Sequence, residues 1–386
     1  MRTWCDVSLD NLKYNIEQIK NKVSDNVKLC GIVKANAYGH GVEEIAANLV
    51  EQGFDYLAVA FIDEAVELRL CGFEQSVLIL GNTPKDTVDQ VIEYNVTASV
   101  YNKETAEILS AEAVKQGKIA KIHLKIDTGM SRIGFLPNSQ SIDEIVSVSK
   151  LPNIEIEGIF THFACSDSDD KTMTLKQFDK FMNVVSELEN HGIKIPIKHC
   201  CNSAAIINYP EMHLDMVRAG IILYGMYPSD IKYDIDLKPL MNFKTSVINV
   251  KTLQAGETIS YGATYTAEKT MRVATIAVGY ADGYSRLLSN CGRVLVKGQF
   301  ANIVGRICMD QCMIDVTNVH NISIGDEVIL FGADENENLP IEELAVKLGT
   351  INYELPCIIN NRVPRCYTKD NKRIKIHNNL SVVKSL

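Results

Sequence analysis

The feature that most constrains the fold is an alternation of short apolar runs with amphipathic stretches over the first two-thirds of the 386-residue chain. Apolar runs of strand length separated by stretches of helical period are typical of β/α units around a parallel sheet. Eight such runs can be counted, at Val27–Val33, Tyr56–Ala60, Val77–Leu80, Val96–Val100, Ile122–Ile126, Ile156–Phe160, Ile197–Cys200 and Met216–Val217. They predict an α/β fold in which eight parallel strands close a TIM-type (β/α)8 barrel.

The segments on either side of these runs have different patterns. A helix is predicted before the first strand, because apolar residues recur with spacings of three and four at Leu9, Leu12, Ile16, Ile19 and Val23. From about Phe243 the chain has β-rich segments punctuated by glycine, at Val273–Val278, Arg293–Lys297, Ala301–Arg306 and Glu327–Phe331.

These patterns predict two domains. We expect a barrel over residues 8–230 and a mainly β C-terminal domain over residues 231–386, which residues 1–7 would join. The proline- and aspartate-containing stretch Met226–Leu240 is the predicted linker. The segment after Lys369 has no clear pattern and is predicted to be a weakly specified tail.

Charge and cysteine usage exclude several classes of protein. A formal net charge of −9 without a Lys/Arg block argues against a nucleic-acid partner. The eleven cysteines are scattered and have no C-x2-C pairing, which favours reduced thiols over a disulfide framework or a metal site. The sequence has no run of about 18 apolar residues, so no membrane span is predicted. Its first residues lack the apolar core of a secretory signal. We therefore expect a cytoplasmic protein without a membrane partner.

Polar side chains follow the predicted strands at their carboxyl ends, where barrel enzymes of this type gather their functional residues. Lys34 follows the first run, Arg132 lies beyond the fifth and His162 follows the sixth. Ser203 and Arg218 come after the seventh and eighth runs. A partly desolvated lysine at a strand end can bond covalently to an aldehyde. On position alone, however, such a lysine more often reaches solvent.

The segment VKANAYGHG, Val33 to Gly41, changes that balance. Gly39 and Gly41, beside the aromatic Tyr38, are predicted to let the backbone approach a bound ring or phosphate. The whole nonapeptide resembles the cofactor-lysine motif of the alanine racemase family.

The resemblance to this family extends over nearly the whole chain, from TWCDVSLDNLKYN to NRVPR. The segments that carry it are KIDTGMSRIGF (125–135), THFACSD (161–167), CNSAAI (201–206), VRAGIILYG (217–225), ISYGATYTA (259–267), GYADGY (279–284), GRICMDQ (305–311) and INYELPC (351–357). It implies a fold type III pyridoxal 5'-phosphate (PLP) enzyme with a β/α barrel, a β-rich C-terminal domain and a head-to-tail homodimer with two shared active sites.

The resemblance also implies how PLP would be held. Lys34 would carry the cofactor and Arg218 would face the pyridine nitrogen, which should stay unprotonated because a guanidinium does not readily accept a proton. The phosphate donors would be the side chains of Tyr38, Ser203 and Tyr353 and the backbone of Gly220 and Ile221. Hydroxyls and backbone N–H groups can surround a dianion without adding a titrating charge.

The substrate groups follow from the same resemblance. Arg132 is expected to face the substrate carboxylate, since a guanidinium offers paired donors. The lysine that matches Lys125 is carbamylated in many family members and orients this arginine. Racemisation needs a proton donor on each face of a planar carbanion, and the resemblance gives the second face to Tyr261 of the other subunit. Tyr265 is the competing tyrosine.

The remaining implied residues support or enclose the site. His162 and His199 would form a network with Arg218 in which His162 bridges Tyr261 and Arg218, although ordinary structural hydrogen bonding of the histidines is an open alternative. The entrance and the pocket wall would be formed by Tyr280, Met309 and Tyr353, whose bulk should admit a methyl side chain and hinder larger ones.

Three alternatives bear on the function. A serine or broad-specificity amino-acid racemase would use the same machinery, and one polar atom is weakly discriminated, so Met309 and Tyr353 favour alanine without deciding it. PLP-carrier proteins share the lysine-bearing barrel but lack the β domain and the motif at Ser260–Gly262. The phosphate-loop and catalytic-cysteine signatures expected of related decarboxylases are not found. If the source is bacterial, as the family suggests, D-alanine for peptidoglycan is the expected product.

Overall fold

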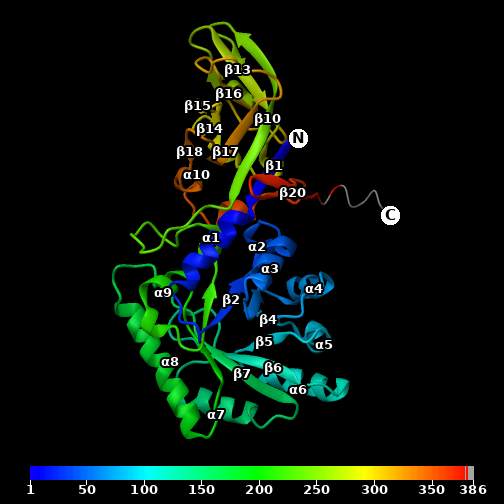
Figure 1. Ribbon diagram of the computed structural model, residues 1–386, viewed down its shortest axis with the longest axis vertical. Coiled ribbons are helices and arrows are strands. Elements are labelled where there is room, and N and C mark those ends of the chain that lie inside the picture. The colour runs from blue at the N-terminus through cyan, green and yellow to red at the C-terminus, as the bar shows by residue number, and fades with distance from the viewer. Residues whose placement is uncertain (379, 381–386) are drawn as a thin grey trace. The chain divides into compact units, whose positions relative to one another are not determined.

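The structure is a computed structural model, and it describes residues 1–378 and 380. The chain forms two compact units (Figure 1). We call the first the barrel unit, which comprises Leu12–Ala37 and Val42–Lys238. The second, the β unit, comprises Met1–Asn11, Tyr38–Gly41 and Pro239–Leu386.

The barrel unit contains eight parallel strands in the order β8-β7-β6-β5-β4-β3-β2-β9. Their bounds are β2 (Lys28–Ile32), β3 (Tyr56–Val59), β4 (Ser76–Ile79), β5 (Thr97–Val100), β6 (Ala120–Lys125), β7 (Ile154–Phe160), β8 (Ile197–His199) and β9 (Met216–Ala219). Backbone hydrogen bonds from Asp215 N to Lys198 O (3.0 Å) and from Arg218 N to Cys201 O (3.1 Å) join the β8 and β9 segments. The predicted barrel and its eight strands are confirmed, with ends that differ by a few residues.

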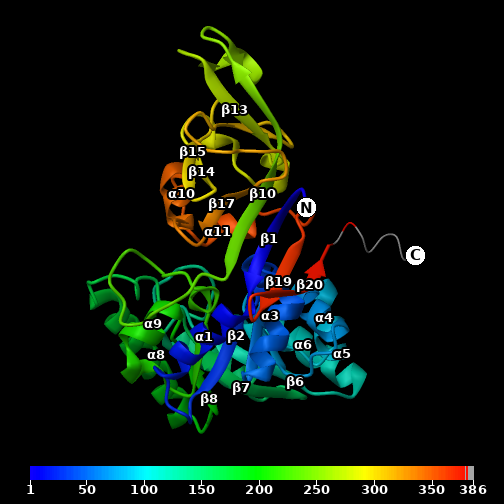
Figure 2. The ribbon, with the colours of Figure 1, turned by 45° about the horizontal axis from the view of Figure 1, so that its top comes forward.

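Helices cover the outside of these strands, as two views show (Figure 1; Figure 2). They form because each buries an apolar stripe, as α6 does with Ala106, Leu109 and Ala113. The helices are α1 (Leu9–Lys20), α3 (Val42–Glu51), α4 (Ile62–Leu70), α5 (Val88–Glu93), α6 (Lys103–Gln116), α7 (Ser139–Val148), α8 (Thr172–Asn190) and α9 (Ser203–Asn208). The predicted first helix is confirmed, but it ends at Lys20 and does not include Val23.

The β unit is built on a ten-stranded sheet with the main path β15-β14-β17-β10-β1-β19-β20. Its strands are β1 (Thr3–Ser8), β10 (Met241–Leu253), β13 (Met271–Ile276), β14 (Arg293–Val296), β15 (Gln299–Asn302), β16 (Cys312–Asp315), β17 (Glu327–Ala333), β18 (Asn338–Leu339), β19 (Arg365–Lys369) and β20 (Lys372–His377). Strand β1 pairs antiparallel with β10 and parallel with β19. Two short helices, α10 (Ile341–Leu348) and α11 (Glu354–Cys357), complete the unit.

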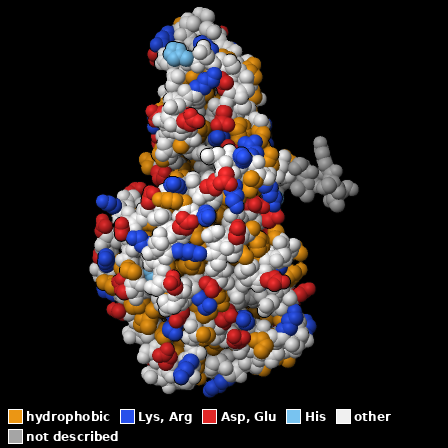
Figure 3. Space-filling view, in the orientation of Figure 1, with side chains coloured by type: hydrophobic (Ala, Val, Ile, Leu, Met, Phe, Trp, Pro, Cys, Tyr) orange, Lys and Arg blue, Asp and Glu red, His pale blue; other side chains and the backbone are white. Residues whose placement is uncertain are grey.

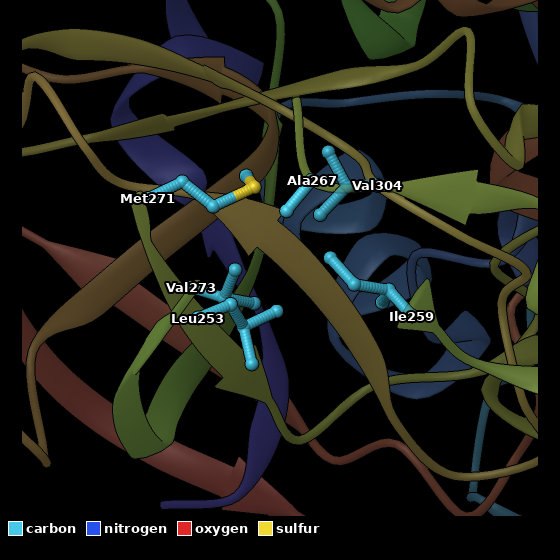
Figure 4. Packing of buried hydrophobic residues seen from close by; sticks show 6 residues of the cluster. All are labelled: Leu253, Ile259, Ala267, Met271, Val273 and Val304. Atoms are coloured by element: carbon cyan, nitrogen blue, oxygen red, sulfur yellow. The ribbon is translucent and has the colours of Figure 1, made fainter. Parts of the chain in front are cut away.

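A small second sheet of the β unit packs on its own core. Strands β11 (Thr258–Ile259) and β12 (Tyr265–Thr266) pair antiparallel. Beneath them lies an apolar cluster whose side chains gather closely in Figure 4, namely Leu253, Ile259, Ala267, Met271, Val273 and Val304. This core fixes the base of the segment that carries the predicted tyrosine.

Two details of the predicted C-terminal region are corrected. The predicted strand Ala301–Arg306 is shorter and begins earlier in the structure. Strand β15 starts at Gln299, after a turn at Lys297 and Gly298, and ends at Asn302. The segment after Lys369 is not weakly specified as far as His377, because β20 pairs antiparallel with β19. The last part of the predicted tail, residues 379 and 381–386, lies outside the described residues.

The surface and the thiols agree with the composition. Acidic and basic side chains are interspersed over the face shown in Figure 3, without a block of one sign. Six of the cysteines are buried free thiols, namely Cys5, Cys30, Cys200, Cys201, Cys312 and Cys366. In the part of the chain that the structure describes, no helix is both long and apolar enough to cross a membrane.

Candidate active site

The segment after β2, which contains Lys34, has an unusual backbone. It forms a short helix, α2 (Lys34–Tyr38), in which Ala35, Asn36, Ala37 and Tyr38 have φ between 51° and 53°. Left-handed helix costs roughly 1–2 kcal/mol per residue for L-amino acids, so this is a strained turn. Strain of this kind accumulates at functional sites, where the surrounding structure enforces it.

Two side chains enforce this turn within the barrel unit. Glu64 Oε1 accepts a hydrogen bond from Ala35 N at 2.6 Å, and Asn36 Oδ1 accepts one from Val42 N at 2.7 Å. The turn therefore holds the half-buried Lys34 at the carboxyl end of β2, as the sequence predicted.

The glycines of the motif are required by close packing in the protein itself. Within the β unit, a Cβ at Gly39 would collide with Pro356 O, and a Cβ at Gly41 would collide with the Tyr367 hydroxyl. Both glycines also have positive φ, 77° and 98°. They admit close protein packing, so the prediction that they admit a ligand lacks support in this structure.

Arg218 lies in the barrel interior with 3% of its surface exposed. Its Nη1 lies 2.9 Å from His199 Nδ1. Its Nη2 donates to Thr161 O (2.9 Å) and Cys200 O (3.1 Å) and lies 3.3 Å from His162 Nδ1. No described carboxylate contacts this guanidinium, and among the described residues none accepts a hydrogen bond from Nε. The Nε donor thus remains for a neutral acceptor such as a ring nitrogen.

The positive charges of four basic side chains act on His162. Its pKa lies well below the usual value, first because the ring is buried and then because of the positive charges of Arg218, Arg132, Lys125 and Lys34. The structure therefore brings the residues predicted after the first, fifth and sixth strands into one electrostatic site with Arg218, which lies within β9 and does not follow it. Such a cluster of cations favours an anionic ligand.

Lys125 is the most perturbed of these cations. It is 3% exposed, its Nζ donates to Ile126 O at 2.9 Å, and the same atom lies 5.2 Å from the centre of the Phe160 ring. Burial, together with the positive charge of Arg218 and against the attraction of Asp127, lowers its pKa to about 7. Much of Lys125 is therefore a neutral amine near neutral pH.

The loop after β6 presents Arg132 to solvent. Asp127 Oδ1 shapes this loop by accepting hydrogen bonds from Gly129 N and Ser131 N, both at 3.0 Å. Ser131, which immediately precedes Arg132, has φ of 57°. An exposed guanidinium on a shaped loop can meet a small carboxylate with two parallel donors.

The predicted phosphate residues form two groups. In the barrel unit, Ser203 Oγ accepts a hydrogen bond from Gly220 N at 3.0 Å, and Ile221 follows directly. In the β unit, the ring centres of Tyr38 and Tyr353 lie 6.3 Å apart. The hydroxyls of Ser203, Tyr38 and Tyr353 are neutral groups of the kind that can donate to a phosphate dianion, whereas the Gly220 N–H already donates to Ser203 Oγ in this structure.

Tyr261 projects from the β unit on a strained turn. Tyr261 is 69% exposed. Two other residues of the turn, Ser260 and Ala263, have φ of 65° and 45°. Ser260 Oγ anchors the turn by donating to Arg306 O at 2.6 Å. By contrast, Tyr265 packs against the apolar cluster, so Tyr261 is the tyrosine that is available to a substrate.

Tyr280 and Met309 are held side by side in the same unit. Backbone hydrogen bonds run from Tyr280 N to Cys308 O (3.1 Å) and from Ala281 N to Met309 O (3.0 Å). Met309 and Tyr261 line one hollow of about 440 Å³. The structure thus places the predicted pocket residues Tyr280 and Met309 next to each other. It also places Tyr261 and Met309 at the same hollow.

Two residues of the barrel interior were missed by the sequence analysis. His123 and Glu157 lie inside predicted apolar strands, but both are buried near His199. A signal was available, because Lys121, His123 and Lys125 alternate along β6 and therefore point to one side of the strand.

Comparison with known proteins identifies the family. The family model described as alanine racemase, N-terminal domain, matches residues 7–228, and the one described as alanine racemase, C-terminal domain, matches residues 240–367. The chain belongs to the alanine racemase family. The resemblance found in the sequence is thereby confirmed.

Individual relatives agree with this assignment. The chain is 50% identical over 97% of both chains to an alanine racemase of Clostridium tetani. The solved alanine racemase of Clostridium difficile 630 is 44% identical, with a TM-score of 0.95 and 98% of each chain covered. The alanine racemase of Bacillus anthracis, solved with bound L-Ala-P, is 35% identical with a TM-score of 0.93, covering 99% of this chain and 98% of that one. Homology therefore makes the chain an isomerase and supports racemisation of alanine.

Proposed function

We propose that the chain is a PLP-dependent alanine racemase that interconverts L- and D-alanine by a two-base mechanism. The observation that carries this proposal is the gathering of Lys34, Lys125, Arg132 and Arg218 around His162. PLP brings a phosphate and an amino acid brings a carboxylate, so this cationic site suits the pair.

The residues of the barrel unit fit PLP in type and position. Lys34 offers an amine for the cofactor aldehyde, and Arg218 Nε offers a donor to the ring nitrogen. Ser203, Gly220 and Ile221 would bind the phosphate, together with Tyr38 and Tyr353. When bound, PLP would supply the electron-withdrawing group that acidifies the substrate Cα proton. Because Arg218 donates and does not accept a proton, the ring nitrogen would stay unprotonated.

The two proton-transfer groups would be Lys34 and Tyr261. Removal of a Cα proton from one face and its return on the other inverts the configuration, which requires a donor on each face. We propose that Tyr261 comes from the second subunit of a homodimer. The 69% exposure of Tyr261 on an enforced turn supports this proposal, because a catalytic phenol needs a partner surface to exclude water.

Lys125 would complete the carboxylate-binding group as a carbamate. A neutral amine reacts with dissolved CO2, and the product carries a negative charge that can orient Arg132. The expected carbamate fits the cationic surroundings of Lys125, where an ammonium is disfavoured.

This expectation can be measured with ¹³C-bicarbonate. A protein carbamate resonance should appear and should grow as the pH rises through about 7, because the amine is protonated below this pKa and neutral above it. Lys125→Ala should lack the resonance, and Lys121→Ala is the matched control from the same strand. A signal that survives Lys125→Ala would place the carbamate elsewhere.

Substrate preference should depend on Met309 and Tyr353 if they narrow the pocket around the methyl group. Met309→Ala or Tyr353→Ala should raise serine turnover relative to alanine by at most the roughly 10–200-fold associated with small pocket differences. The ratio of the two kcat/KM values measures this effect. If neither substitution changes the ratio, specificity arises from other residues, and a broad-specificity racemase becomes the better description.

The function itself is tested by incubating the PLP-loaded protein separately with L-alanine and L-serine and separating the enantiomers. We expect D-alanine to form fastest and to approach equal amounts of both enantiomers. In a bacterium this product would supply peptidoglycan synthesis. Faster formation of D-serine would favour the alternative, and no product from either amino acid would refute the proposal.

A further inference from the structure

The interior of the barrel contains a column of polar side chains where such barrels are usually filled by layers of apolar residues. His123 and His199 are completely buried, Arg218 is 3% exposed and Glu157 is 8% exposed. They come from four different strands, β6, β8, β9 and β7. A buried polar group is costly unless it is paired, so the way in which these four are connected carries information.

The four side chains are connected end to end. Arg218 Nη1 lies 2.9 Å from His199 Nδ1, and His199 Nε2 lies 2.9 Å from His123 Nδ1. His123 Nε2 lies 3.4 Å from Glu157 Oε2. The last pair is a close contact and not a hydrogen bond, because His123 Nε2 has no hydrogen-bond partner among the residues that the structure describes, but the carboxylate is the group that faces this nitrogen.

The chemistry of the first member fixes the direction of every link. A guanidinium has donors and no acceptor, so His199 Nδ1 must accept and the proton of that ring must sit on Nε2. Nε2 of His199 therefore donates to His123 Nδ1, which leaves the proton of His123 on Nε2. That proton points at the Glu157 carboxylate, so all three links run from Arg218 toward Glu157.

Protonating either imidazole would break this order, since it would bring two donors face to face. The charges around the column oppose such protonation. Burial, and then the positive charge of Arg218, lower the pKa of His199, while burial outweighs the attraction of Glu157 and lowers the pKa of His123. The positive charge of Lys121, which also lies on β6, further opposes protonation of His123.

Glu157 is itself firmly anchored. Its Oε1 lies 3.0 Å from Lys121 Nζ, and its Oε2 accepts from Thr97 Oγ1 at 3.2 Å. Burial opposes its ionisation, but the nearby His123 and Lys121 outweigh burial and lower its pKa to about 2. A fixed negative charge therefore ends the column.

Gly158, the residue after Glu157, leaves room for the His123 imidazole. A Cβ at Gly158 would lie 2.5–2.7 Å from three atoms of the His123 imidazole. The backbone of Gly158 has no positive φ that would otherwise require glycine. The space for the imidazole thus accounts for glycine at this position.

We infer that Glu157 is a positioning residue for Arg218 and that it acts through His123 and His199. The carboxylate faces the last imidazole of a one-directional chain that fixes the guanidinium, and it supplies the counter-charge of Arg218 from a distance. Arg218 can then be held in an orientation that leaves Nε as a donor, with no carboxylate beside the cofactor to attract a proton. The role of Nε rests on the proposed function, whereas the chain and its direction do not.

The direction of the chain can be measured by ¹⁵N NMR of the histidine side chains in the full-length protein, with and without PLP. Both His123 and His199 should be neutral, with the proton on Nε2, and should stay so from pH 5.5 to 8.5. His123→Gln and His199→Gln would assign the resonances. An Nδ1-protonated or an imidazolium form of either ring within this range would overturn the inference, whatever the activity of the protein.

Three variants test the positioning role. Glu157→Leu removes the acceptor, Glu157→Gln keeps a carbonyl acceptor but removes the charge, and Gly158→Ala displaces the His123 ring. Glu155→Gln is the matched control, because Glu155 is an exposed carboxylate on the same strand. Glu157→Leu and Gly158→Ala should lower kcat on the order of 10- to 100-fold through misplacement of Arg218, with a small change in the KM for alanine. Glu157→Gln should restore the wild-type tautomers and part of this loss.

The outcomes separate this inference from the proposed function. If the wild type shows the expected tautomers but neither binds PLP nor racemises alanine, the proposed function fails and the hydrogen-bond chain stands. If Glu157→Leu and Gly158→Ala both match Glu155→Gln in kcat and in their histidine spectra, the positioning role is wrong. The wild-type spectra decide the direction of the chain even if a variant does not fold.

Discussion

Homodimers of Lys34→Ala and of Tyr261→Phe are each expected to lose racemase activity by about 10²- to 10⁴-fold, because each lacks one of the two proton-transfer groups. Lys34→Ala should also lose the covalent bond to PLP, so its loss should be the larger. Tyr265→Phe is the matched control. It should keep near-normal activity, because Tyr265 packs on the apolar cluster while Tyr261 is exposed.

Mixing the two inactive variants tests whether the site is shared between subunits. Random pairing of equal amounts should make roughly half of the dimers mixed. In a mixed dimer one site lacks both groups, and the other receives Lys34 from the Tyr261 variant and Tyr261 from the Lys34 variant. Activity should therefore return to about a quarter of the wild-type value. No recovery after verified subunit exchange would mean that both groups come from one chain.

Arg218→Glu should slow racemisation on the order of 10²- to 10³-fold, the usual cost of losing a donor that stabilises developing charge. A carboxylate at this position would stabilise a protonated ring nitrogen, where the guanidinium does not. The ¹⁵N resonance of labelled PLP should therefore move toward that of a pyridinium. The same substitution places a carboxylate at each end of the column, so the wild-type state, with both histidines neutral and protonated on Nε2, should be lost.

Arg218→Lys is the control for charge alone, since it keeps a cation but loses the paired donors. Circular dichroism should show that both variants retain the fold. A wild-type rate and an unchanged ring-nitrogen resonance in Arg218→Glu would show that Arg218 does not face the cofactor. It would also contradict the reason that we infer for the positioning of Arg218 by Glu157.

The strands and their carboxyl-end residues could be predicted from sequence because both follow from simple periodicity. Apolar runs of strand length identify the barrel, and the barrel brings Lys34, Arg132, His162 and Arg218 to one end. The gathering of these four at one electrostatic site therefore needed no information beyond the order of the elements. The roles of the individual residues came from the resemblance to the family.

The left-handed turn after β2 could not be predicted, because its sequence has no local signal for it. Ala35 and Ala37 ordinarily avoid this conformation, and glycine begins only at Gly39. The turn depends on hydrogen bonds to Glu64, which lies far along the chain, and from Val42 to Asn36. Tertiary contacts therefore override local preference at this site.

The polar column was missed because the register of two strands decides which residues face the interior. The pairing of β6 with β7 shifts between Ile122 and His123, where an irregularity changes the alternation of β7. A strict alternation of side chains between the two faces of β7 would therefore assign Glu157 or Gly158 to the wrong face. Once the register is known, the pairing of His123 with His199 follows from their positions on β6 and β8.

The central claim is that Lys34 holds the cofactor, and borohydride reduction of the PLP-loaded protein tests it most directly. Reduction should fix the pyridoxyl group permanently on one lysine, which digestion and mass spectrometry then identify. Lys125→Ala should be labelled like the wild type, while Lys34→Ala should not be labelled. We predict a single modified peptide that contains Lys34. Recovery of the label on Lys125 or any other lysine of the wild type would contradict the account.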